Sequence, residues 1–211
     1  GVVLQQEYFS MIKEAGFDFI RVPIKWSNHS DTEAPYAIED SFFERIDWVI
    51  DNGLENQLKV MINIHHYDEI MEEPASHHDR FLAIWQQIAQ RYQDYPSDLF
   101  FELLNEPTGQ LSASLWNQYA QDGIEVIRQS NPTRYIVVGG VFWNAYSSLS
   151  TLELPEDRYL IATFHYYLPM NFTHQGASWV PGSQAWLGTT WEGTAVEQEE
   201  IRSHFSQAST W

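Results

Sequence analysis

The sequence predicts an α/β fold, and within that class a (β/α)8 TIM barrel of which about five of the eight strands are present. Segments rich in Val, Ile and Phe alternate with segments whose apolar residues recur at helical spacing, which is typical of parallel strands covered by helices. Polar side chains gather where the apolar segments end, as they do around a barrel active site. No glycine-rich phosphate-binding motif follows a strand, which disfavours an open nucleotide-binding sheet. We therefore expect a single, partial domain over residues 1–211.

The first half of the chain alternates between helix and strand. Residues 4–16 carry apolar side chains at helical spacing and end on Gly16, a common helix stop. The apolar run over residues 17–24 follows as a strand. A helix over 41–57, a strand over 59–66 and a helix over 81–92 continue the pattern. We assign the aromatic residues that recur at helical spacing in these helices to the core: Phe42, Phe43, Trp48, Phe81 and Trp85.

The second half repeats the alternation. The strand over 99–107 (LFFELLNEP) is followed by a helix over 114–129 and a strand over 135–141. The segment at 145–154 has no clear pattern. The last strand covers 159–167, and a final helix starts at about Thr194. The chain thus begins and ends on a helix, which predicts that one strand before it and two after it are absent.

Composition excludes several classes of partner. The 11 Lys and Arg residues against 29 Asp and Glu residues give a net charge of −18, which repels nucleic acid and anionic membrane surfaces. No apolar run approaches the roughly 20 residues that span a bilayer, so we expect a soluble protein. The absence of cysteine excludes disulfides and thiolate chemistry. Aromatic residues make up 15% of the chain, and rings outside a core commonly stack on a ligand such as a sugar.

Glu106 is the candidate acid. If the strand continues through 99–107, the side chains of Glu102, Leu104 and Glu106 share one face, with Glu106 at the rim. Desolvation there would raise the pKa of the Glu106 carboxyl and let it donate a proton to a leaving oxygen. Asn105 is placed to bond a substrate hydroxyl. The alternative is that Asn-Glu-Pro is only a turn before a helix whose N-terminus suits a glutamate.

Two other polar groups have structural interpretations. Glu102 should face the barrel interior, where an unpaired charge is costly, and Arg21 is its expected partner. The histidine pairs suggest a metal site, but adjacent residues on a strand point to opposite faces, so we predict none. Those pairs are His65 with His66 and His77 with His78.

Five segments together resemble glycoside hydrolase family 5, and in particular its thermophilic-type endoglucanases. They are GFDFIRVPIKW, VMINIHHYDE, LFFELLNEP, IATFHYY and the loop FTHQGASWVPGSQAWLG. They occur in the family's order, and the resemblance covers essentially the whole chain. It implies a (β/α)8 barrel that hydrolyses β-1,4-linked glucan with retention, with one Glu as acid and base and a second as nucleophile, and without a cofactor. It also implies secretion, with any signal on a segment outside the chain.

The resemblance also assigns roles to residues of this sequence. It implies that Glu106 is the acid/base, that Asn105 holds the sugar 2-hydroxyl and that Arg21 orients the nucleophile. His165 and Tyr167 would tune the acid and contact the nucleophile. The residues implied to bind substrate are His65, His66, Trp143, His174 and Trp179, and Trp186 is a further candidate for sugar contact because it lies in the same Gly- and Ser-rich loop.

The family's nucleophile has no counterpart in this sequence. A retaining site needs a second carboxyl group roughly 5 to 5.5 Å from the first. Glu192, Asp68 and Glu69 are the nearest substitutes by sequence, but we interpret all three as solvated loop charges. The chain alone could therefore be inactive, or be a polysaccharide-binding fragment. A mannan-cleaving or dual glucanase and mannanase activity is the alternative within the enzyme class, and the oligomeric state stays open.

Overall fold

Five parallel strands form one sheet in the order in which they occur along the chain. The computed structural model describes residues 3–211. Its strands pair in the order β1-β2-β3-β4-β5. Their bounds are β1 Phe19–Ile24, β2 Lys59–Ile64, β3 Leu99–Glu102, β4 Ile136–Gly139 and β5 Leu160–Thr163. The predicted α/β fold with five strands is confirmed.

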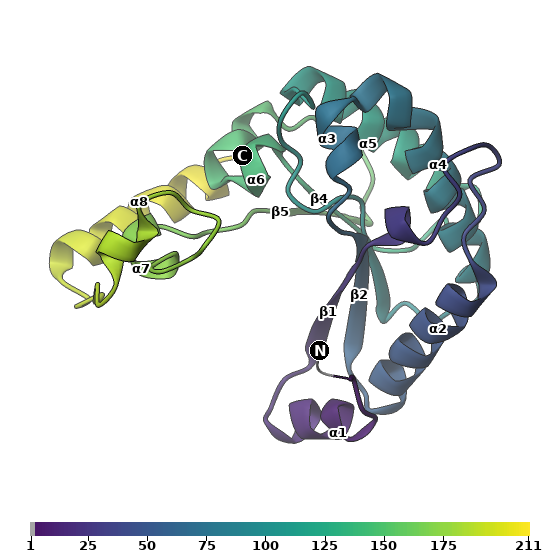
Figure 1. Cartoon of the computed structure of the whole chain (residues 1–211), viewed down its shortest axis with the longest axis horizontal. Helices are drawn as coiled ribbons and strands as arrows, with labels where there is room; N and C mark the ends of the chain where they lie inside the picture. Colours follow the sequence, from purple (N-terminus) through teal and green to yellow (C-terminus); the bar gives the residue numbers. More distant parts are fainter. Residues whose placement is uncertain (1–2) are drawn as a thin grey trace.

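Helices cover the outer side of this sheet. Figure 1 shows α2, α4 and α5 following one another along the outside of the curved sheet, with α8 beyond β5. The longer helices are α1 Glu7–Glu14, α2 Asp40–Glu55, α4 Pro74–Arg91, α5 Ala113–Arg128 and α8 Ala195–Ser209. The short ones are η1 Trp26–Asn28, α3 Asp68–Glu72, α6 Val141–Asn144, η2 Tyr146–Thr151, α7 Met170–Thr173 and η3 Ser183–Trp186. Among residues 3–211, no helix has the length and apolar character needed to cross a bilayer.

Local sequence explains where the helices begin. Ser112 caps α5 by accepting a hydrogen bond from the Leu115 amide at 3.3 Å. Thr194 and Glu197 form a reciprocal capping box at the start of α8, as expected for a helix that starts at about Thr194. α4 begins at Pro74, seven residues before the predicted start, because proline is well suited to the first turn of a helix.

The main core lies between the sheet and its helices. Ile62 of β2 and Phe101 of β3 are fully buried, and Trp85 of α4 packs on Phe101 while its indole N–H donates to the Leu103 carbonyl at 3.0 Å. This bond satisfies the one polar atom of a buried tryptophan. Of the predicted core aromatics, Phe43, Phe81 and Trp85 are buried, and Phe42 and Trp48 are half-buried against the core clusters.

The strands end earlier than predicted. β3 stops at Glu102 and not at Pro107, and β2 stops at Ile64 and not at His66. The chain leaves the sheet at these points and turns through residues with positive φ, which apolar alternation does not predict. The unassigned segment at 145–154 contains η2.

The sheet is open. In the described sheet β1 and β5 each pair on one side only, and they do not pair with each other (Figure 1). A closed barrel has no such edges, so a curved parallel sheet with its helices outside fits part of a (β/α)8 barrel.

Candidate active site

The connections after β2, β3 and β4 carry an unusual backbone. His66 and Glu106 have φ of 51° and 50°, and the consecutive residues Phe142, Trp143 and Asn144 have φ of 55°, 59° and 56°. A left-handed conformation at a residue other than glycine costs on the order of 1–3 kcal/mol, and such strain clusters at functional sites. All five residues follow the carboxyl end of a strand, where a barrel enzyme builds its site.

Arg21 of β1 forms hydrogen bonds with β3 and with the segment that follows β3. Its guanidinium donates to both Glu102 carboxylate oxygens, from Nε at 2.6 Å and from Nη2 at 3.0 Å. Nη2 also donates to Asn105 Oδ1 at 2.8 Å. The predicted pairing of Arg21 with Glu102 is confirmed, and the same cation fixes the orientation of the Asn105 amide.

Asn63 is a site residue that the sequence analysis missed. It is fully buried in β2, and its Nδ2 lies 3.1 Å from Glu102 Oε2 and 3.1 Å from His65 Nδ1. Its Oδ1 accepts from the Ile24 amide at 3.3 Å. The available signal was a lone amide within the apolar run VMINI, because buried polar side chains are retained where they find partners.

Glu106 faces residues that follow β5. Its Oε1 lies 2.5 Å from His165 Nδ1 and accepts a hydrogen bond from the Tyr167 hydroxyl at 3.1 Å. Within residues 3–211, Oε2 accepts no hydrogen bond. The side chain is 23% exposed, so solvent and a ligand can reach it. The predicted alternation of Glu102, Leu104 and Glu106 on one face is wrong, since β3 ends at Glu102.

The expected rise in the pKa of Glu106 is also wrong. Burial by itself raises this pKa, but the hydrogen bonds that His165 and Tyr167 donate to the carboxylate lower it, and the net result is a pKa below its ordinary value. Burial and the Glu106 carboxylate in turn raise the pKa of the Tyr167 hydroxyl. In this arrangement Glu106 is an ionised carboxylate that is held by two donors.

His65 and His66 lie against each other. Their ring centroids are 4.3 Å apart in an edge-to-face arrangement, so the prediction that they point to opposite faces is wrong. β2 ends before them, and His66 turns the chain. Burial, together with the neighbouring His66 and Arg21 charges, lowers the pKa of His65 to about 4. No cluster of three or more His, Cys, Asp or Glu side chains that could hold a metal occurs in the part of the chain that the structure describes.

The remaining predicted substrate residues lie in the two connections that follow β4 and β5. The His174 ring packs edge-on against Tyr167 at 5.1 Å, so it borders the Glu106 cluster. Trp143 is 59% exposed, and its backbone amide donates to the Pro107 carbonyl at 3.2 Å, which ties its loop to the Asn-Glu-Pro segment. Trp179 is 77% exposed, and Trp186 is half-buried. Among residues 3–211, no ring contact joins Trp179 to the other site residues.

Asp68, Glu69 and Glu192 are the nearest substitutes for a nucleophile by sequence. Asp68 and Glu69 form the first turn of α3 directly after β2, so their assignment to a loop is wrong. Asp68 pairs with Lys25 at 3.6 Å. Glu192 lies in the connection before α8, where the Thr190 hydroxyl donates to it. The Asn-Glu-Pro segment is likewise not a helix start, because the next helix begins at Ala113.

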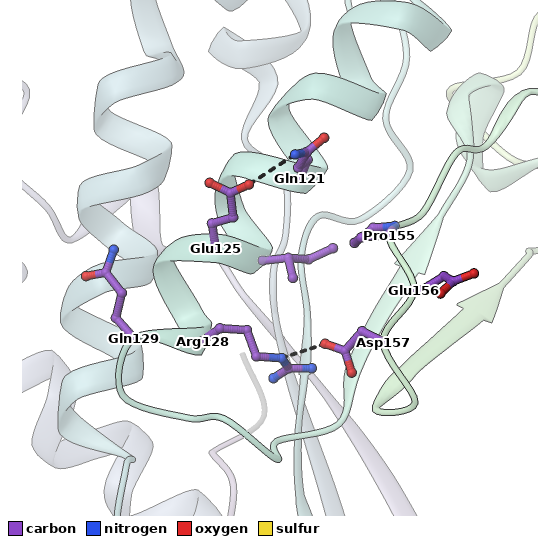
Figure 2. Close-up of a pocket in the computed structure, with 8 residues that line it drawn as sticks. Gln121, Glu125, Arg128, Gln129, Pro155, Glu156 and Asp157 are labelled. Carbon is purple, nitrogen blue, oxygen red and sulfur yellow. Dashed lines mark hydrogen bonds and ion pairs between the residues drawn. The ribbon is translucent and has the colours of Figure 1, made fainter.

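A cavity of about 470 Å³ lies elsewhere, between α5 and the segment before β5. Figure 2 shows Arg128 and Asp157 pointing toward each other in it, with Nε and Oδ2 2.7 Å apart. Asp157 precedes β5, so this cavity is at the amino ends of the strands and away from Glu106. Its ion pair joins α5 to the segment before β5. We do not assign a catalytic role to this cavity.

Known proteins that are similar to this chain include cellulases and endoglucanases. The family model described as Cellulase (glycosyl hydrolase family 5) matches residues 3–211. Endoglucanase H from Acetivibrio thermocellus is 36% identical over 204 residues, which are 97% of this chain and 21% of that protein. The chain therefore spans about a fifth of that relative.

Solved structures match over the whole chain. The crystal structure of endoglucanase Cel5A from the hyperthermophilic Thermotoga maritima superposes with a TM-score of 0.97 at 47% identity and covers 100% of this chain and 68% of that chain. Structures of Thermotoga maritima Cel5A with mannotriose and with cellobiose superpose with a TM-score of 0.95, and each covers 98% of this chain and 67% of that chain.

Proposed function

The chain belongs to glycosyl hydrolase family 5, and from this we propose that its protein hydrolyses β-1,4-glycosidic bonds in glucan, as an endoglucanase or cellulase, with Glu106 as general acid/base. We further propose that the 211 residues form one partial catalytic domain and that the protein is secreted, because a polymeric substrate stays outside the cell. Named relatives that are endoglucanases support this function.

The single observation that supports it most strongly is the environment of Glu106. His165 and Tyr167 hold one carboxylate oxygen, which leaves the other free to exchange a proton with a leaving oxygen or with water. The neighbouring Asn105 amide is fixed by Arg21 and can bond a sugar hydroxyl beside the reacting carbon. A protein that only binds sugar would need exposed rings but not the Arg21 guanidinium and the buried Asn105 amide that it fixes.

The proposed reaction is a double displacement. In the first step a second carboxylate attacks the anomeric carbon, the glycosidic bond breaks, and Glu106 gives its proton to the leaving oxygen. In the second step Glu106 takes a proton from water while the water oxygen attacks the anomeric carbon and displaces that carboxylate. We propose that the nucleophile lies outside these 211 residues. A second carboxylate roughly 5 to 5.5 Å away would raise the pKa of Glu106, which its partners in this chain hold low.

A mannan is the second candidate substrate. Complexes of the same Thermotoga enzyme with mannotriose and with cellobiose exist, so we propose that the related site of this protein can admit either sugar, with glucan preferred. Parallel reducing-sugar assays on β-1,4-glucan and β-1,4-mannan would rank the two, and a higher kcat/KM on mannan would overturn the preference for glucan.

The test of the acid/base assignment is Glu106→Gln in the longest chain that the gene encodes. An amide cannot donate the proton, so we expect a loss of about 10²–10⁴-fold in kcat on an unactivated glucan, with polysaccharide affinity retained. An aryl glycoside with an acidic leaving group should suffer less. Glu125→Gln on α5, next to the remote cavity, is the matched control and should keep its activity. Turnover of glucan by Glu106→Gln at the control rate would refute the assignment.

A further inference from the structure

We propose that Asn144 is a positioning residue for the reaction: it holds His165 as the neutral ring that carries its proton on Nδ1 and presents it to Glu106. This inference rests on the proposed role of Glu106 as acid/base. Asn144 is the last residue of α6 and is not among the site residues predicted from the sequence.

Asn144 is held in place by the backbone of His165, which follows β5, and lies close against Gly139 of β4. It is fully buried and has φ of 56°, a left-handed conformation that asparagine tolerates better than most residues. Its carbonyl accepts a hydrogen bond from the His165 amide at 2.8 Å, and the adjacent Ala145 forms a parallel bridge with His165. A Cβ on Gly139 would lie 2.4 Å from Asn144 Oδ1 and Cγ, so β4 makes room for this amide by having glycine there.

The Asn144 amide faces the ring nitrogen that Glu106 does not use. His165 Nδ1 is 2.5 Å from Glu106 Oε1, and an ionised carboxylate only accepts, so Nδ1 carries the hydrogen. Asn144 Nδ2 lies 3.5 Å from His165 Nε2. An N–H group directed at Nε2 requires a lone pair there, and this selects the neutral ring with hydrogen on Nδ1 alone.

The ring charge matters because it acts on Glu106. A doubly protonated His165 would hold Glu106 ionised and oppose its work as an acid, whereas a neutral ring still donates its Nδ1 hydrogen and orients the carboxylate. The titratable and charged groups around His165 are Glu106, Tyr167 and His65, with Arg21 beyond His65. Of these groups only Glu106 favours a positively charged His165 ring. The Asn144 N–H group opposes this preference, because it faces Nε2 and needs the lone pair of that nitrogen.

The orientation of the Asn144 amide decides between the two charge states. In the structure Asn144 Oδ1 is buried without a hydrogen-bond partner among the described residues. Rotating the amide by half a turn would bring Oδ1 to Nε2 and favour a ring protonated on both nitrogens. An aspartate at position 144 would impose that second state permanently, because it offers only acceptors.

The first measurement needs no variant. The chain has 8 histidines, so 15N-histidine labelling of the longest chain that the gene encodes gives a sparse spectrum, and His165→Gln identifies the His165 signals. At pH 7 we expect His165 to show a protonated Nδ1 and an unprotonated Nε2. A proton on Nε2 alone, or on both nitrogens, would overturn the proposal.

Variants then test the role of the amide. Asn144→Asp should give a doubly protonated His165 at pH 7 and move the high-pH limb of kcat/KM on soluble glucan downward by about one pH unit or more. Asn144→Gly tolerates the left-handed backbone and removes the amide, so it should give a mixture of ring tautomers. Phe142→Gly, at an exposed left-handed position in the same loop, is the control for loosening and should leave the His165 signals unchanged.

The two measurements separate this inference from the proposed function. Expected His165 signals in a protein that hydrolyses no glucan would support the placement of the His165 proton by Asn144 and reject the proposed function. The protein could instead hydrolyse glucan while Asn144→Asp changes neither the high-pH limb of kcat/KM nor the His165 signals. That result would leave the function intact and overturn the role of Asn144.

Discussion

Replacing Arg21 with methionine should lower the free energy of unfolding by about 3 kcal/mol, because it leaves the Glu102 carboxylate buried without its cation. Glu102 is 1% exposed and accepts two hydrogen bonds from Arg21. The third bond, from Asn63 at 3.1 Å, would remain but comes from a neutral amide. Breaking a buried pair costs about 3–5 kcal/mol, and we expect the lower end since the Arg21 side chain is 28% exposed, so water can reach the vacated space.

Denaturant unfolding followed by tryptophan fluorescence measures this loss, since the chain has 9 tryptophans. The double variant Arg21→Met with Glu102→Leu should recover stability to within about 1–2 kcal/mol of the parent, because no charge is then left buried and only Asn63 and Asn105 lose partners. Arg202→Met, which breaks the exposed pair with Glu199 on α8, is the control and should change stability by about 0–0.5 kcal/mol. A loss in Arg21→Met as small as in the control, or a double variant no more stable than Arg21→Met, would refute the reasoning.

Three further outcomes are expected. Trp179→Ala should raise KM on soluble glucan with little change in kcat, because a stacked ring holds substrate and transfers no proton, and an unchanged KM would return Trp179 to the ordinary loop residues. The His65 ring should titrate at about pH 4 by NMR. The free energy of unfolding should fall as the pH drops from about 6.5 to about 4, because the unfolded chain then binds a proton that the folded chain does not. A titration midpoint near pH 6.5, or the same fall in stability in His65→Gln, would contradict this. These 211 residues expressed alone should elute as oligomers in size-exclusion chromatography, because β1 and β5 expose unpaired edges. They should release no reducing sugar from β-1,4-glucan, because the proposed nucleophile lies outside them. A monomeric, active form would show that a second carboxylate lies within the sequence, with Glu192 the first to test.

The pairing of Arg21 with Glu102 shows how far local patterns reach. A charge in the middle of a predicted apolar strand must find a counter-charge, and Arg21 is the one arginine within the predicted strands, so the pair was predictable. Asn63 followed the same logic and could have been found. The prediction that His65 and His66 bind no metal assumed that side chains alternate along β2 as far as these residues. β2 ends at Ile64, so the alternation does not reach His65.

Glu106 shows where such patterns fail. Its candidacy followed from a strand end with a carboxyl group, but its orientation follows from a φ of 50°, which no hydrophobic period reveals. Its pKa was expected to rise because only burial was visible in the sequence. The donors that reverse the sign, His165 and Tyr167, are 59 and 61 residues away along the chain.

The sequence by itself determined the alternation of strands and helices, the parallel sheet and the gathering of polar residues at strand ends, because these depend on the spacing of apolar side chains and on residue preferences within a few positions. Only the tertiary structure decided that Asn144 contacts the far side of the His165 ring, that Asn105 is fixed by Arg21 and that Glu106 is ionised. Those properties depend on distances of a few ångströms between groups that are far apart in the sequence, and electrostatic and hydrogen-bond energies change steeply over such distances.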